Sequence, residues 1–134
     1  MSLIRYEADP LPAIVVSADD HKRLVDLAEA SEDRIPDVAS VLQAEMDRAR
    51  VLPADEISDE AVRMGSTVEF SADGGRPRRV TLVYPGEADI AEGRISILTP
   101  IGAALIGVSR GQSIAWTARD GRRRWLTVLN VAQP

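Results

Sequence analysis

The chain has 134 residues, of which 45% are hydrophobic and 28% are charged. This balance is typical of a globular protein and excludes an intrinsically disordered one. The absence of cysteine excludes disulfide bonds and thiolate metal sites. The longest apolar run, residues 101–108, is far shorter than the roughly 20 residues that cross a bilayer. Glu7 and Asp9 near the start are unlike a secretory signal, so we expect a cytoplasmic protein without a membrane partner.

The net charge of −5 is unevenly distributed along the chain. Residues 1–63 hold 15 Asp and Glu against 7 Lys and Arg, a net charge of −8. Residues 64–134 hold 9 Arg against 6 Asp and Glu, a net charge of +3. An acidic chain is poorly suited to non-specific nucleic-acid binding, because phosphate contacts need an excess of cations. The asymmetry indicates two parts with different electrostatic roles, or simply acidic helices that face solvent.

The first expected elements are two helices. Ser17 followed by Asp20 is similar to a capping box, and apolar residues then recur at helical spacing up to Ala28. Residues 30–34 break this pattern and predict a loop. Pro36 suits the first turn of a second helix, which Pro53 ends. We expect a short antiparallel helical hairpin, a coiled coil, with an apolar stripe on its second helix formed by Val38, Val41, Leu42, Met46 and Ala49.

Beyond Val62 the hydrophobic period changes from that of a helix to that of a strand. Short strands are expected around residues 68–70, 80–84, 95–97, 114–116 and 125–131, with turns at 72–75 and 120–121. Thr99 and Pro100 predict the start of a short helix that stops at Gly107. The fold class is therefore α+β, with one helix packed on antiparallel strands. We divide the chain into an N-terminal tail and hairpin (1–53) and a β-rich C-terminal domain (54–134).

No residue pattern predicts a catalytic, metal or cofactor site. The single histidine, His21, lies on the first turn of the first helix, where an exposed histidine is ordinary. The acidic loop 87–92 lacks the convergent carboxylates of a metal site. Residues 102–107 have the glycine spacing of a phosphate loop, but no Lys and Ser or Thr follow. We expect a protein that is not an enzyme.

Two arginine clusters lie beside predicted turns in the C-terminal half. They are solvated hairpin ends or a basic rim that meets an acidic protein surface or nucleic acid. Base stacking needs exposed aromatic side chains between cations, and five aromatic side chains offer little for it. The two clusters are Arg76, Arg78 and Arg79, and Arg122, Arg123 and Arg124.

Glu32 and Asp33 lie at the expected tip of the hairpin. A pair of carboxylates at the end of a rigid projection could place a metal ion in the active site of another protein. The alternative is that a loop between helices is acidic because it faces water. The pattern alone favours the second interpretation.

From Met64 onward the chain resembles the C-terminal domain of the Gre transcript-cleavage factors. The resemblance lies in colinear blocks that cover about half of the chain: Met64-Gly-Ser-Thr-Val-Glu-Phe70, Thr81-Leu-Val-Tyr84, Gly86-Glu-Ala-Asp89, Gly93-Arg-Ile-Ser-Ile97, Thr99-Pro-Ile-Gly-Ala-Ala-Leu-Ile-Gly107 and Gly111-Gln-Ser113. Over its whole length the chain is similar to a smaller branch of that family, the regulators of nucleoside diphosphate kinase, including the block 44–49. The resemblance implies an FKBP-like C-terminal fold.

The resemblance also implies a partner, RNA polymerase, bound at the rim of its secondary channel. Carried over by position, the docking residues are Leu98, Thr99, Pro100 and Ile101. We expect a monomer that contacts DNA, if at all, only through the polymerase complex. Gre factors reach the catalytic centre of the polymerase with a long acidic-tipped hairpin. Helices of about 12 and 15 residues give arms of roughly 18–22 Å, several turns shorter, so the resemblance implies docking without transcript cleavage.

Three alternatives stay open on the sequence. The chain could be an active cleavage factor that docks differently and uses Glu32 and Asp33. It could be a peptidyl-prolyl isomerase, since the implied fold is FKBP-like, although few aromatic residues are present to build the proline pocket. It could also regulate the kinase by direct protein contact, which no residue favours over control of transcription.

Overall fold

The computed structural model describes residues 11–134, and its first two helices form the predicted hairpin. Helix α2 (Ala18–Ser31) begins at Ser17, whose Oγ accepts a hydrogen bond of 3.1 Å from the Asp20 amide. Helix α3 (Pro36–Arg48) has its proline in the first turn, as predicted. The helices have 14 and 13 residues, and α2 extends into the stretch that we expected to be a loop. Glu7 and Asp9 lie outside the described residues.

Two short strands that the sequence pattern did not reveal close the base of this hairpin. Strand β1 (Val15–Ser17) precedes α2, and strand β2 (Arg50–Leu52) follows α3. They pair in parallel, with Val15 opposite Arg50, and the Arg50 amide donates to the Ile14 carbonyl oxygen at 3.0 Å. The pairing fixes the two ends of the hairpin side by side. A short 3₁₀ turn, η1 (Ala54–Glu56), then leads into the second half of the chain.

The second half is a five-stranded sheet in the order β5-β4-β3-β7-β6. Strand β3 pairs with β4 and β7, and β6 pairs with β7, all antiparallel as predicted. Strand β5 instead runs parallel to β4, so the prediction of an entirely antiparallel sheet is wrong there. The cause is the connection, residues 84–93, which returns the chain through two 3₁₀ turns to the end where β4 begins before β5 starts. The elements are β3 (Thr67–Ala72), β4 (Arg78–Val83), η2 (Pro85–Glu87), η3 (Ile90–Glu92), β5 (Arg94–Ser96), helix α4 (Pro100–Leu105), β6 (Ser113–Thr117) and β7 (Arg123–Ala132).

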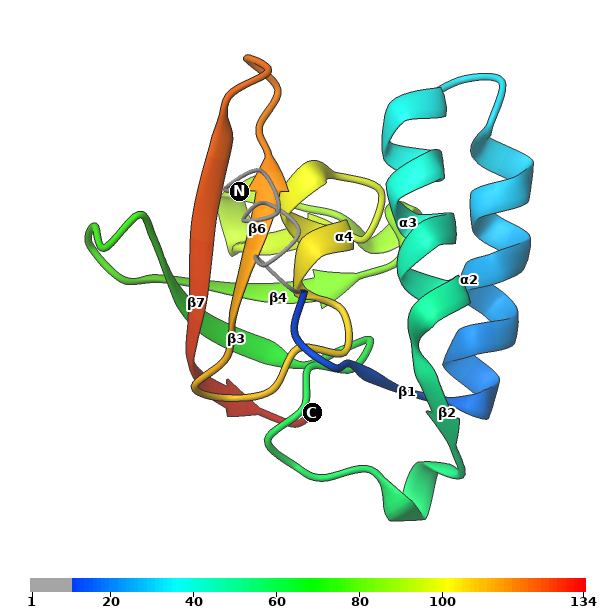
Figure 1. Cartoon of the computed structure of the whole chain (residues 1–134), viewed down its shortest axis with the longest axis horizontal. Helices are drawn as coiled ribbons and strands as arrows, with labels where there is room; N and C mark the ends of the chain where they lie inside the picture. The colour runs from blue at the N-terminus through cyan, green and yellow to red at the C-terminus, as the bar shows by residue number, and fades with distance from the viewer. Residues whose placement is uncertain (1–10) are drawn as a thin grey trace, which may run out of the picture.

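One buried cluster joins the hairpin to the sheet. Leu24 and Leu42 of the hairpin belong to the same cluster as Phe70 of the sheet and Leu105 of α4. Helix α4 lies between the hairpin and the sheet, so the hairpin stands alongside the β-rich part (Figure 1). Val41 was expected in the apolar stripe but is 46% exposed, because it lies on the flank of the face that α3 packs inward.

The observed architecture confirms the α+β class. Three finer points stay predictions: a domain boundary between residues 53 and 54, coiled-coil packing of the hairpin, and an FKBP-like fold of the C-terminal part. Among the described helices, none is long and apolar enough to cross a membrane.

Candidate partner-binding site

The loop that opens α4 is held by its own polar groups. Thr99 is the N-cap: its Oγ1 accepts from the Gly102 amide at 3.0 Å and donates to the Ser96 carbonyl oxygen at 2.8 Å. The Ser96 Oγ accepts from the Leu98 amide at 2.9 Å. Pro100 occupies the first helical turn, where its missing N–H costs nothing. These bonds within seven residues give the loop a defined shape and explain why its sequence predicted a helix start.

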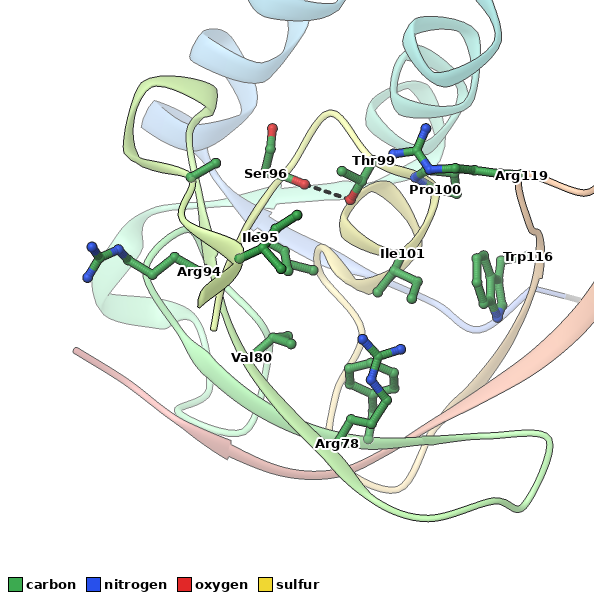
Figure 2. Close-up of a pocket in the computed structure, with 13 residues that line it drawn as sticks. Arg78, Val80, Arg94, Ile95, Ser96, Thr99, Pro100, Ile101, Trp116 and Arg119 are labelled. Atoms are coloured by element: carbon green, nitrogen blue, oxygen red, sulfur yellow. Dashed lines mark hydrogen bonds between the residues drawn. The ribbon is translucent and has the colours of Figure 1, made fainter. Parts of the chain in front are cut away.

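Three of the four predicted docking residues line one cavity of about 340 Å³. These are Thr99, Pro100 and Ile101, all half-buried, whereas Leu98 packs against the core and is not part of the cavity wall. Figure 2 shows Ile101 pointing between Trp116 and the strands. The remaining apolar side chains of the wall come mainly from β3, β4, β5 and β6: Phe70, Val80, Ile95 and Trp116.

Arginine side chains stand at the rim of this apolar cavity. The Arg78 guanidinium lies over the Phe70 ring, 5.5 Å from its centroid. Arg94 contacts Asp89 at 3.7 Å, and Arg119 lies beside Pro100 (Figure 2). The site therefore combines an apolar floor with a positive edge, which suits a partner that presents an apolar side chain flanked by carboxylates. The walls of the cavity come from strands far apart in the chain, so no sequence pattern predicted it.

A second groove lies next to this cavity and shares part of its wall. It has a volume of about 580 Å³ and is lined by Val38 and Val41 of α3 and by Ile114 of β6. Pro100 and Trp116 line both hollows, so they form the ridge between them. Helix α3 therefore contributes to the surface beside the loop 96–102 that opens α4, a juxtaposition that the division into two domains did not anticipate.

The hairpin tip lies apart from the loop 96–102 that opens α4. Glu32 and Asp33 are exposed in the turn between α2 and α3, at the end of the hairpin remote from β1 and β2 (Figure 1). Neither residue lines the cavity at Thr99. Within residues 11–134, no group of three His, Cys, Asp or Glu side chains is placed to hold a metal ion. The His21 ring contacts the Met46 carbonyl oxygen through Nε2 at 3.1 Å, which ties α2 to α3.

A polar cluster at the base of the hairpin joins α2 to the sheet. The Asp20 carboxylate accepts a long hydrogen bond of 3.4 Å from the Met64 amide, and the Arg23 guanidinium lies 4.1 Å from the centroid of the Tyr84 ring. Burial raises the pKa of Asp20 and, together with the nearby Asp20 charge, raises the pKa of Tyr84. No sequence pattern indicated this cluster, because each of these two contacts joins residues that lie more than 40 positions apart. Its contacts join the first two turns of α2 to residues before β3 and after β4.

Two families match successive parts of the chain. The family described as "Rnk N-terminus" matches residues 12–52, and the family described as "Transcription elongation factor, GreA/GreB, C-term" matches residues 57–133. The regulator of nucleoside diphosphate kinase of Escherichia coli (strain K12) is 34% identical over 121 residues, which cover 90% of this chain and 89% of that protein. The transcription elongation factor GreA of Nitratidesulfovibrio vulgaris (strain DSM 19637 / Miyazaki F) is 37% identical over 94 residues, 69% of this chain and 58% of that protein.

A solved structure shares the fold as well as the sequence. The prokaryotic transcription elongation factor GreA/GreB from Nitrosomonas europaea has 34% sequence identity and a TM-score of 0.71. The match covers 89% of this chain and 98% of that one. The resemblance inferred from the sequence is thereby confirmed, and it supports a regulator of the transcription-elongation-factor type. The chain belongs to the GreA/GreB transcription elongation factor family, in the branch of the regulators of nucleoside diphosphate kinase.

Proposed function

We propose that the protein binds RNA polymerase at its secondary channel through residues 98–101 and does not stimulate transcript cleavage. The observation that carries the proposal is the length of the hairpin. Helices of 14 and 13 residues span about 21 and 20 Å at 1.5 Å per residue. Moreover, α3 packs along α4 and does not stand free of the docking loop (Figure 1). Such a tip cannot carry Glu32 and Asp33 into a deeply recessed active centre.

The form of the docking loop supports the same proposal. Pro100 and Ile101 present half-buried apolar groups at the mouth of a cavity whose edge is positive. Interfaces commonly bind through one apolar anchor in a pocket with a polar rim around it. An apolar side chain of the polymerase that enters the cavity, with acidic neighbours facing Arg78 and Arg119, would satisfy both features.

The first experiment measures polymerase binding by the full chain and by Pro100→Asp. A carboxylate placed at the cavity mouth must lose water on docking, so we expect the affinity to fall at least about tenfold, which corresponds to about 1.4 kcal/mol. Pro85→Asp is the matched control, because Pro85 also occupies the first position of a short helix but is exposed and lies outside the cavity wall. Equal affinities of the two variants would remove the loop from the interface.

The second experiment measures transcript cleavage by stalled polymerase with and without the protein. We expect no stimulation, and we expect the double variant Glu32→Ala/Asp33→Ala to behave as the wild type does. Clear stimulation that the double variant loses would instead establish an active cleavage factor. A secondary-channel factor added as competitor should displace the protein from the polymerase.

The apolar cavity raises a second candidate function, that of a prolyl isomerase. Two aromatic side chains, Phe70 and Trp116, line it, whereas sites that hold a proline ring are usually richer in aromatic contacts. A chymotrypsin-coupled assay on a proline peptide distinguishes the candidates. We expect no acceleration above the uncatalysed rate.

A further inference from the structure

The five-stranded sheet has a face that turns away from the helices and carries an exposed tryptophan. On β7 the side chains of Leu126 and Val128 are buried, so Trp125 and its neighbours two residues away point to the opposite face. Trp125 is 44% exposed. Its partner across β6 is Ala115, whose small side chain leaves the indole ring open to solvent. On β7 only Leu129, 37% exposed, is another large apolar side chain open to solvent, so the exposed ring calls for an explanation beyond packing.

The strand ends around this ring are strongly basic. Seven arginines and only two aspartates occur in residues 73–79 and 117–124. Both aspartates, Asp73 and Asp120, contact the same arginine, Arg124, at 3.5 and 3.1 Å. Among the described residues, none of the other six has a carboxylate within 4.0 Å: Arg76, Arg78, Arg79, Arg119, Arg122 and Arg123. Arg78 and Arg119 line the cavity at Thr99, so four of these six arginines remain outside it: Arg76, Arg79, Arg122 and Arg123.

Backbone contacts fix Trp125 at the point where the two arginine-bearing hairpins separate. The Asp73 amide donates to the Trp125 carbonyl oxygen at 2.7 Å, and the Asp73 Oδ1 accepts from the Trp125 amide at 2.8 Å. Beyond this point β7 pairs only with β6, and the β3–β4 and β6–β7 tips diverge (Figure 1). Alternation from the buried Val80 places Arg79 on the open face, and Arg123 lies on the same face as Trp125. Arg79 lies opposite Glu69 of β3 on this face, and Arg123 lies two residues from Trp125 on β7, so each hairpin contributes a cation to the face that carries the ring.

We propose that this surface, which we call the Trp125 face (Arg79, Arg123, Trp125 and the turns 73–76 and 120–122), binds single-stranded nucleic acid. An exposed ring between cations is the arrangement that stacks one base while the arginines contact the flanking phosphates. A paired base cannot offer its face to the ring, so duplex DNA is a poor occupant. A protein partner is also disfavoured, because the neighbours of Trp125 are mainly small and polar: Ala115, Thr117, Ser71, Ser113 and Thr127.

This proposal goes beyond the proposed docking on RNA polymerase, which uses the other face of the sheet. It also departs from the expectation that nucleic acid is contacted only through the polymerase complex. The aromatic residues of the sequence are too few to predict base stacking. The fold nevertheless places one of them, Trp125, on an open face that also carries arginines.

The test is the binding of labelled single-stranded oligonucleotides to the full chain by fluorescence anisotropy. The probes are 12-mers of uridylate and of deoxythymidylate, measured at about 50 and about 200 mM salt. Three or four phosphate contacts on a single strand predict an affinity that falls about 20- to 50-fold between these salt concentrations. We expect Trp125→Ala to weaken binding at least about fivefold and Trp125→Phe to retain most of it, because every aromatic ring has a stacking face.

Charge reversal separates the Trp125 face from the overall charge. We expect Arg79→Glu/Arg123→Glu to abolish measurable binding. The matched control is Lys22→Glu/Arg34→Glu, which makes the same change of charge on the exposed hairpin and should leave most of the affinity intact.

Two results would overturn the proposal. One is the absence of saturable binding to either oligonucleotide at low salt. The other is binding that Trp125→Ala and the double reversal leave unchanged. If these variants instead weaken polymerase binding while the wild type ignores oligonucleotides, the face is a protein contact and the proposal is wrong. Variants that lose oligonucleotide binding but still bind polymerase would support the proposal. The ratio of the wild-type affinities for the uridylate and deoxythymidylate 12-mers would identify RNA or DNA as the preferred strand.

Discussion

Gly102→Ala tests whether the shape of the docking loop depends on the absence of a side chain. Gly102 lies in the first turn of α4, and its amide donates to Thr99 Oγ1. A Cβ atom at this position would lie within 3.0 Å of the Ser96 carbonyl oxygen and 2.9 Å from Thr99 Oγ1, closer than real Cβ atoms come to such neighbours. Neither oxygen is free to move, because Thr99 Oγ1 also donates to the Ser96 carbonyl oxygen.

The magnitude follows from opposing contributions. Alanine is favoured over glycine in a helix by about 1 kcal/mol. Overpacking against backbone costs about 1–3 kcal/mol, and loss of the Thr99 cap adds about 1 kcal/mol. We therefore expect a net destabilisation of about 1–3 kcal/mol. For a chain of 134 residues this corresponds to a fall in Tm of about 4–11 °C.

The assay is unfolding by heat and by urea, followed by far-ultraviolet circular dichroism. Gly86→Ala is the matched control, since no heavy atom lies within 4 Å of the Cβ it would add. We expect that control to stay within about 0.5 kcal/mol of the wild type. A Gly102→Ala protein as stable as the wild type, or more stable, would show that helix propensity outweighs the contact and would refute the reasoning.

Three further predictions concern the rest of the molecule. Arg48→Met should lower the free energy of unfolding in urea by about 2–4 kcal/mol, because it leaves the buried Glu45 carboxylate without the guanidinium that contacts it at 2.7 Å; a loss below about 0.5 kcal/mol would contradict this. Leu24→Ala, in the core, should cost about 3 kcal/mol, against less than about 1 kcal/mol for the partly exposed Leu129→Ala. Burial raises the pKa of Asp20, so the Asp20 carboxyl group binds its proton more tightly in the folded protein than in the unfolded chain. The stability that this group contributes is therefore lost as the pH rises from about 4 through its folded pKa. The advantage of Asp20→Asn over the wild type in urea should therefore grow between about pH 3.5 and about pH 7, and a constant difference would show that Asp20 is not the group responsible.

The sequence determined the elements whose signals are local. Ser17, Pro36 and Thr99 begin their helices where predicted, because a cap or a first-turn proline acts within three or four residues. The turns after Ala72 and at Gly121 are also where expected, at backbone conformations with positive φ for Asp73, Gly74 and Gly121. The family blocks likewise predicted the position of the loop that opens α4.

Only the tertiary structure decided what depends on pairing between distant segments. Strands β1 and β2 are three residues each and lie more than 30 residues apart, so neither carries a pattern long enough to reveal the other. The direction of β5 depends on the path of its connection, and the apolar cavity needs walls from four strands. The alternation in β7 shows that Trp125 and Leu126 face opposite ways, but not which of them is buried. Register and the position of α4 settle that choice, because apolar area is buried only on the face that another element covers.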